Sequence, residues 1–116
     1  MKFENVLAHL DVDDFDGALS WYERFFGRPA DERPMDGTAE WQLSPGGGIQ
    51  IFRSVGSPTT VVLGVADVDT IVEEIFGRGI VAAIDEKLSG KFRLAFVKNP
   101  ADNTIVLSSR PPATRV

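Results

Sequence analysis

Val12-Asp13-Asp14-Phe15-Asp16 and Val65-Ala66-Asp67-Val68-Asp69, which lie 53 residues apart, are the stretches that decide the fold. Each follows a short apolar run typical of a strand, and each opens a segment of helical periodicity that closes at a glycine. Further strand-like runs come after each glycine. One unit of strand, helix and strands is therefore used twice, and this duplication predicts the architecture of the whole chain.

The first helix is predicted over Phe15 to Phe26, where apolar residues recur at helical spacing and give one broad buried face. Asp14 is a suitable N-cap, because its side chain can accept a hydrogen bond from the first turn. Gly27 can take the left-handed conformation of a C-cap, and Pro29 prevents the helix from continuing.

The second helix is predicted from Val68 to Phe76, where apolar residues follow the i, i+3, i+4, i+7 pattern, and Gly79 ends it. Turn-forming residues at 44–48 and 99–103 separate predicted strands, and 55–58 is the natural joint between the two halves. The predicted strands are Phe3 to Leu10, Glu40 to Leu43, Gly48 to Arg53, Thr60 to Val65, Ile80 to Ile84, Phe92 to Val97 and Thr104 to Ser109, with a further short one between Pro29 and Pro34.

The composition indicates one globular domain over residues 1–116, with a first module at about 3–54, a second at about 59–109 and a frayed tail at 110–116. The chain is 43% hydrophobic and has no cysteine, which excludes disulfides and thiolate metal sites. No apolar run reaches the ~18 residues of a membrane span, and the first residues do not lead into a secretory signal. We therefore expect a cytoplasmic protein, and a net charge of −5 disfavours nucleic acid as a partner.

Two segments carry a family resemblance. The segment 14–27, with Trp21-Tyr22 and Phe26-Gly27, resembles the first helix of the vicinal oxygen chelate superfamily, which includes glyoxalase I, the bleomycin resistance proteins and the extradiol dioxygenases. The segment 93–100, followed by Asp102-Asn103, resembles that family's closing hairpin. In the family the turn is usually Asp-Pro, a spacer and Gly-Asn; here Asn99 and Asp102 stand for the Asp and the Gly, and both are turn formers.

The resemblance implies an α+β fold of two tandem βαβββ modules, whose curled mixed sheet surrounds a cleft while the helices pack outside. It also implies that the modules pair either within one chain or across a dimer, and a homodimer is expected.

Strand alternation assigns the residues to the two faces of this sheet. The face toward the helices is expected to hold Val6, Ala8, Leu10, Ile49, Ile51, Val61, Leu63, Val65, Ile105 and Leu107. The cleft face is expected to hold Asn5, Leu7, His9, Gln50, Phe52, Thr60, Val62, Thr104, Val106 and Ser108, a mixture that suits a small-molecule site.

Metal-dependent relatives hold a divalent ion with four side chains, and the resemblance places these positions at Leu7, Gln50, Thr60 and Val106. Leucine and valine have no lone pair to donate, so we predict that the metal is absent and that the protein uses no cofactor. His9, two residues beyond the first position, is a displaced ligand, a general acid or base, or a neutral histidine that lines the cleft.

Two other residues, Trp41 and Arg93, keep two interpretations each. Trp41 faces either the cleft or the helix layer, whereas Phe52 is a candidate for an aromatic wall. Arg93 either meets an anionic ligand or is a solvated edge residue. The predicted ligand-binding set is Leu7, His9, Trp41, Gln50, Phe52, Thr60, Val62, Arg93, Val106 and Ser108, with His9 as a weak catalytic candidate.

The leading hypothesis is a bleomycin-resistance-type protein that binds a small organic molecule in the cleft without a metal ion. The alternative is a metal-dependent enzyme of the glyoxalase or dioxygenase type, for which Gln50 and His9 are the best evidence. A third hypothesis is an interaction module whose cleft is closed by side chains.

Overall fold

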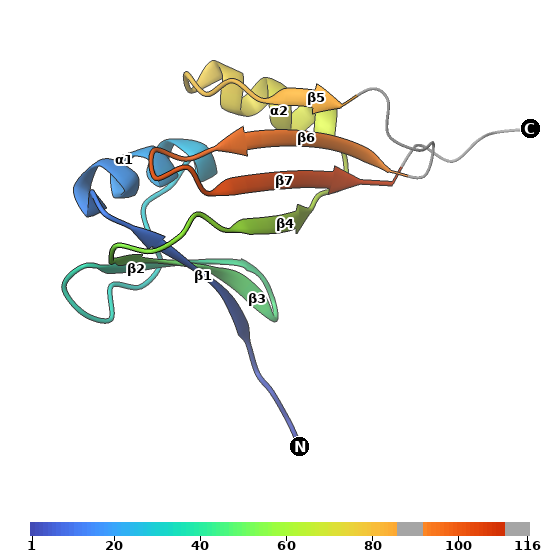
Figure 1. Ribbon diagram of the computed structural model, residues 1–116. Helices are drawn as coiled ribbons and strands as arrows, with labels where there is room; N and C mark the ends of the chain where they lie inside the picture. The colour runs from blue at the N-terminus through green and yellow to red at the C-terminus, as the bar shows by residue number, and fades with distance from the viewer. Residues whose placement is uncertain (86–91, 111–116) are drawn as a thin grey trace, which may run out of the picture.

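The computed structural model describes residues 1–85 and 92–110, and its elements repeat one pattern of strand, helix and strands (Figure 1). They are β1 (Val6–Val12), α1 (Phe15–Phe26), β2 (Thr38–Ser44), β3 (Gly47–Arg53), β4 (Thr60–Gly64), α2 (Val68–Gly77), β5 (Ala83–Asp85), β6 (Arg93–Lys98) and β7 (Thr104–Ser109).

The strands form two mixed sheets, one for each module. The first has the order β1-β3-β2 and the second the order β4-β7-β6-β5. In each sheet the opening strand runs parallel to the closing strand, and the other pairs are antiparallel. The α+β fold with a duplicated module is therefore confirmed. The two sheets are not hydrogen-bonded into one, so β1 and β4 are edge strands.

Both helices begin and end where local sequence predicts. The Asp14 side chain accepts a hydrogen bond from the Gly17 N–H at 3.1 Å, and Gly27 has a φ of 73°. In α2 the Asp67 side chain accepts from the Asp69 N–H at 3.1 Å. After α2, Gly79 has a φ of 84° and the Ile80 N–H donates to the Ile75 carbonyl at 2.9 Å, a glycine-dependent helix ending.

Three predicted strands differ from the structure. The first strand begins at Val6 instead of Phe3, because its parallel partner β3 begins only at Gly47. The short strand expected between Pro29 and Pro34 is wrong; that segment makes one isolated bridge between Glu32 and Glu40. The strand predicted at 80–84 is shorter and later, at 83–85, where β6 offers partners. The expected tail lies outside the described residues from residue 111 onward.

The core lies between the sheets and the helices. Leu10, Ile49 and Ile51 of the first sheet are buried on the side of α1, and Ile105 and Leu107 of the second sheet on the side of α2. One member of the predicted helix-facing set is not covered: Val6 is 70% exposed, at the start of β1. Ala8, Val61, Leu63 and Val65 are half-buried.

The closing hairpin of the second module turns at the predicted place. Asn99 accepts hydrogen bonds from the Ala101 and Asn103 N–H groups, both at 2.9 Å. Asp102 takes a φ of 64°, a conformation that favours glycine and that aspartate tolerates, which explains why it can stand at the family's glycine position. In the described part of the chain, neither helix has the length and apolarity needed to cross a membrane.

Candidate functional site

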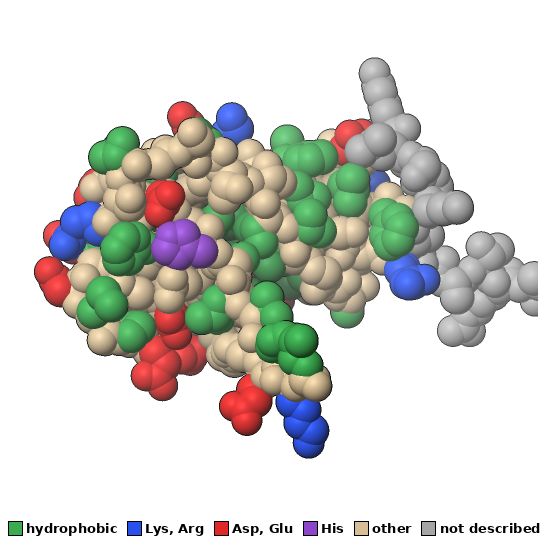
Figure 2. Space-filling view, turned by 60° about the horizontal axis from the view of Figure 1, so that its bottom comes forward, with side chains coloured by type: hydrophobic (Ala, Val, Ile, Leu, Met, Phe, Trp, Pro, Cys, Tyr) green, Lys and Arg blue, Asp and Glu red, His purple; other side chains and the backbone are tan. Residues whose placement is uncertain are grey.

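The face of the first sheet that points away from α1 carries a line of polar side chains. His9 of β1 lies directly across from Gln50 of β3, and Glu40 of β2 lies across from Gln50 on its other side. Phe52 shares this face, with its ring centroid 5.6 Å from that of His9. Figure 2 shows the histidine, in purple, at the surface of the molecule.

These side chains are linked by hydrogen bonds from one carboxylate to another. His9 Nε2 lies 3.1 Å from Asp11 Oδ1, and His9 Nδ1 lies 2.7 Å from Gln50 Oε1. Gln50 Nε2 donates to Glu40 Oε2 at 2.6 Å. A carboxylate only accepts, so Glu40 determines that the Gln50 amide turns its oxygen toward His9. Each nitrogen of the imidazole therefore lies against an acceptor oxygen, and a neutral imidazole can donate to only one of the two.

The corresponding face of the second sheet holds no charged side chain among the predicted residues. Thr60 lies across from Thr104, Val62 across from Val106, and Gly64 across from Ser108. Val62 is 63% exposed, whereas Val106 is buried. These predicted residues offer apolar contacts and hydroxyl groups, and Lys98 of β6, across from Thr104, adds a charged side chain to the same face.

Two residues of the predicted ligand-binding set lie elsewhere. Trp41 is fully buried against α1, between Tyr22 and Phe26, and its indole N–H donates to the Arg28 carbonyl at 3.1 Å. Of the two directions that the sequence left open for Trp41, the structure shows that it faces the helix layer. Arg93 forms an ion pair with Asp69 at the start of α2, with Nη2 3.0 Å from Oδ1, so it lies on the helix side.

Sequence reasoning missed the two carboxylates at the ends of this row, Asp11 beside His9 and Glu40 beside Gln50. Asp11 could have been found, because it follows His9 by two residues and so shares its face. Glu40 gave no local signal, since its position depends on the register that pairs β2 with β3. The remaining members of the predicted set, Leu7, His9, Gln50, Phe52, Thr60, Val62, Val106 and Ser108, lie on the open faces of the two sheets.

The residues at the family's metal positions do not fit a divalent ion. Leu7 and Val106 have hydrocarbon side chains, and Thr60 and Gln50 are neutral. Each nitrogen of His9 lies against an oxygen of Gln50 or Asp11, so a metal ion bound to either nitrogen would require that side chain to move. Across residues 1–85 and 92–110, no group of three or more His, Asp or Glu side chains is arranged to hold an ion.

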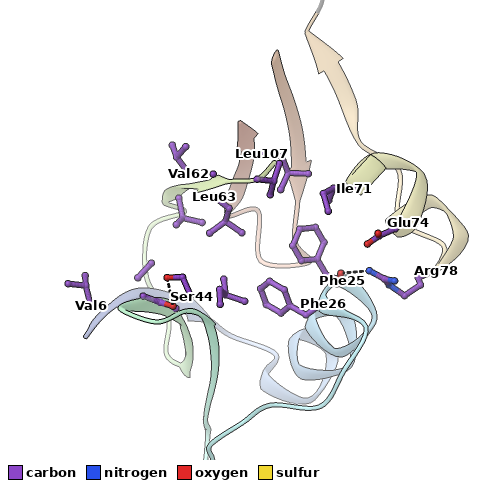
Figure 3. A pocket seen from close by; sticks show the side chains of 17 residues that line it. Val6, Phe25, Phe26, Ser44, Val62, Leu63, Ile71, Glu74, Arg78 and Leu107 are labelled. Carbon is purple, nitrogen blue, oxygen red and sulfur yellow. Dashed lines mark hydrogen bonds between the residues drawn. The ribbon is translucent and has the colours of Figure 1, made fainter. Parts of the chain in front are cut away.

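A cavity of about 510 Å³ lies between the two modules, on the side of the helices (Figure 3). Phe25 and Phe26 of α1 form one wall, and Leu63 and Leu107 of the second sheet form another. Of the residues predicted to bind a ligand, only Val62 lines it. The sequence did not indicate this cavity, because its walls come from seven separate elements, β1, α1, β2, β3, β4, α2 and β7.

Glu74 and Arg78 stand together at one end of this cavity (Figure 3). The Arg78 guanidinium donates to the Phe25 carbonyl at 2.9 Å and to the Arg24 carbonyl, so it caps α1 from α2. Its charge is therefore engaged in joining the two modules.

No family model matches the chain, and no curated protein matches it. Solved structures do match. A glyoxalase/bleomycin resistance protein from Catenulispora acidiphila is 27% identical, with a TM-score of 0.86 over 93% of this chain and 99% of that one. A glyoxalase/bleomycin resistance protein/dioxygenase from Nocardioides is 14% identical, with a TM-score of 0.73 over 99% of this chain and 88% of that one.

A lactoylglutathione lyase from Agrobacterium tumefaciens is 14% identical, with a TM-score of 0.70 over 90% of this chain and 91% of that one. In its fold, the chain is therefore similar to glyoxalase/bleomycin resistance proteins, which is consistent with the vicinal oxygen chelate superfamily. Its structural neighbours are glyoxalase/bleomycin resistance proteins, so the resemblance seen in the sequence is confirmed.

Proposed function

We propose that this protein binds a small organic molecule on the open face of its sheets and does so without a metal ion. The observation that carries the proposal is that Asp11, His9, Gln50 and Glu40 contact one another in a row, with an oxygen of Asp11 or Gln50 against each imidazole nitrogen. Such a face can offer a ligand the half-buried ring of Phe52, the face of the imidazole and the oxygens of two carboxylates. The hydrocarbon side chains at two of the four family metal positions support the same proposal.

Thermal unfolding tests the proposal that the protein binds its ligand without a metal ion. A metal that binds the folded protein at 100 times its Kd stabilises it by about 2.7 kcal/mol, which shifts the Tm by several degrees. We expect no shift with nickel, zinc, manganese or iron(II), and none with a chelator. A reproducible, saturable rise in Tm with any of these ions would overturn the metal-independent proposal.

Nuclear magnetic resonance with a library of small organic fragments tests the proposal that the open face binds such a molecule. Fragments that bind here should shift the ring resonances of His9 and the side-chain amide resonances of Gln50. Replacing Phe52 with alanine should weaken these fragments several-fold, because an aromatic contact contributes about 1 kcal/mol. Phe76→Ala is the matched control, since Phe76 is 68% exposed on α2. Equal binding by both variants would contradict the assignment of the site.

One observation favours a second candidate function. An imidazole, an amide and a carboxylate side chain stand next to one another on the first sheet, and these are the residue types that metal-dependent relatives use. A lactoylglutathione lyase is among the proteins of similar fold. Turnover of a hemithioacetal in the presence of added metal would support a glyoxalase-type enzyme over the binding protein.

The expected homodimer and the cytoplasmic location stay predictions. A molecular mass in solution equal to that of one chain would contradict the dimer.

A further inference from the structure

The cavity between the modules is bordered by the free edge of β4. Five consecutive residues, 61 to 65, line it. Side chains of neighbouring strand residues point to opposite faces, so an unbroken run means that the edge of the strand, and not one of its faces, meets the cavity. The wall opposite comes from Val6 and Ala8 of β1 and from Phe25 and Phe26 of α1.

The hydrogen bonds to β7 show which backbone groups of β4 remain available. The Val65 N–H donates to the Ser108 carbonyl at 2.8 Å, and the Thr104 N–H donates to the Thr59 carbonyl at 2.9 Å. In a parallel ladder, alternate residues bond to the partner strand and the residues between them direct both groups the other way. Thr60, Val62 and Gly64 therefore turn their N–H and C=O groups away from β7. In the part of the chain that the structure describes, no strand pairs with this edge.

This geometry specifies the chemistry of an occupant. The volume of about 510 Å³ lies within the usual range for small-molecule pockets, and most of the wall is hydrocarbon. An occupant that displaces water from the edge must replace the hydrogen bonds of Val62 and Gly64, because unpaired buried backbone groups are costly. The Arg78 guanidinium already donates to the end of α1, so nothing here requires an anionic ligand.

We propose that the cavity binds a small, mainly hydrocarbon molecule that carries an amide group, and that this amide pairs with the backbone of Val62 and Gly64. The hydrocarbon part lies against Phe25, Phe26 and Leu63. The cavity uses the backbone edge of β4 and not the open face around His9, and Val62 is the one residue of the predicted open-face set that lines it.

The capped dipeptide acetyl-leucyl-valine amide is a suitable probe, and amide hydrogen exchange followed by nuclear magnetic resonance is a suitable readout. Without the probe, the Val61 and Leu63 amides should exchange slowly and the Val62 and Gly64 amides quickly. Addition of the probe should slow exchange at Val62 and Gly64 and shift their resonances. An analogue with an ester in place of the central amide loses one donor and should bind about fivefold more weakly.

Val62→Pro removes the outward N–H without removing a hydrogen bond to β7, which an edge strand tolerates. This variant should lose most of the binding at an unchanged Tm. Thr60→Pro is the matched control, because it removes an equivalent outward N–H at a residue that does not line the cavity; it should bind as the unaltered protein does.

Three results would overturn the proposal. The first is that the probe, up to its solubility limit, changes neither the exchange rates nor the resonances of the Val62 and Gly64 amides, and the second is that the ester analogue binds as tightly as the amide. The third is that both amides are protected from exchange in the absence of the probe, and that this protection increases with protein concentration. The last result would mean that a second copy of the chain covers the edge. None of these results would affect fragment binding measured at His9 and Gln50, so the two proposals fail separately.

Discussion

Replacing Asn99 with alanine tests how the closing hairpin of the second module is joined to the first module. Asn99 is only 3% exposed, and its Nδ2 donates to the Tyr22 hydroxyl of α1 at 2.8 Å. Its Oδ1 accepts from the N–H groups of Ala101 and Asn103, both at 2.9 Å. The turn also anchors the site, because Asn103 Nδ2 donates to the carbonyl of Asp11 at 3.0 Å.

The cost of Asn99→Ala follows from the groups that lose their partners. The Asn103 N–H is buried, and a buried unpaired donor costs about 1–3 kcal/mol. The Ala101 N–H is half-buried, so water can replace much of its bond. The Tyr22 hydroxyl is fully buried and loses its donor, which adds about 1 kcal/mol. We therefore expect the free energy of unfolding to fall by about 3 kcal/mol.

Urea unfolding followed by tryptophan fluorescence and circular dichroism measures this change. Tyr22→Phe should cost about 1 kcal/mol, because only the hydroxyl is removed, and the double variant should show that the two changes are not additive. Asn5→Ala is the control: its bonds to Gln42 are exposed, and its effect should stay within about 0.5 kcal/mol. A loss below about 1 kcal/mol for Asn99→Ala would refute the argument that this cluster joins the modules.

Trp41→Ala should lower the free energy of unfolding by about 3–5 kcal/mol in the same assay, because Trp41 is fully buried beside Tyr22 and Phe26. Phe3→Ala, at an exposed position, is the control and should have little effect. A small loss for Trp41→Ala would contradict the burial of Trp41 against α1 and favour its placement in the cleft. Asp31 tests pH dependence: the hydrogen bond from Arg28, and then that from the Gln42 N–H, hold the pKa of Asp31 below its ordinary value of 3.8. A carboxyl group with a lowered pKa stabilises the fold fully above pH 3.8, and this stabilisation is lost as the pH falls through the folded-state pKa. Asp31→Asn should therefore lower the urea midpoint at neutral pH, and its effect should be much smaller at a pH far below 3.8. Asp36→Asn, at a side chain that is 93% exposed, is the control, and an equal effect of Asp31→Asn at both pH values would contradict the argument.

Much of the fold could be predicted because its signals are local. The bounds of α1 match the prediction residue for residue, since Asp14, Gly27 and the apolar spacing between them act within a few turns of chain. The turn at Asn99 was predicted for the same reason. The first strand was predicted three residues too early, because its start depends on where β3 begins and not on its own residues.

The sequence by itself determined the duplicated module, the helix ends, the closing turn and the absence of donors at Leu7 and Val106, because each of these depends on residue type and short spacing. Only the tertiary structure decided that Trp41 faces α1, because a strand has a period of two and a shift by one residue exchanges its faces. The contact of Glu40 with Gln50 and the cavity along β4 also depend on tertiary structure, since they join elements that are distant in the chain and whose register no local pattern records.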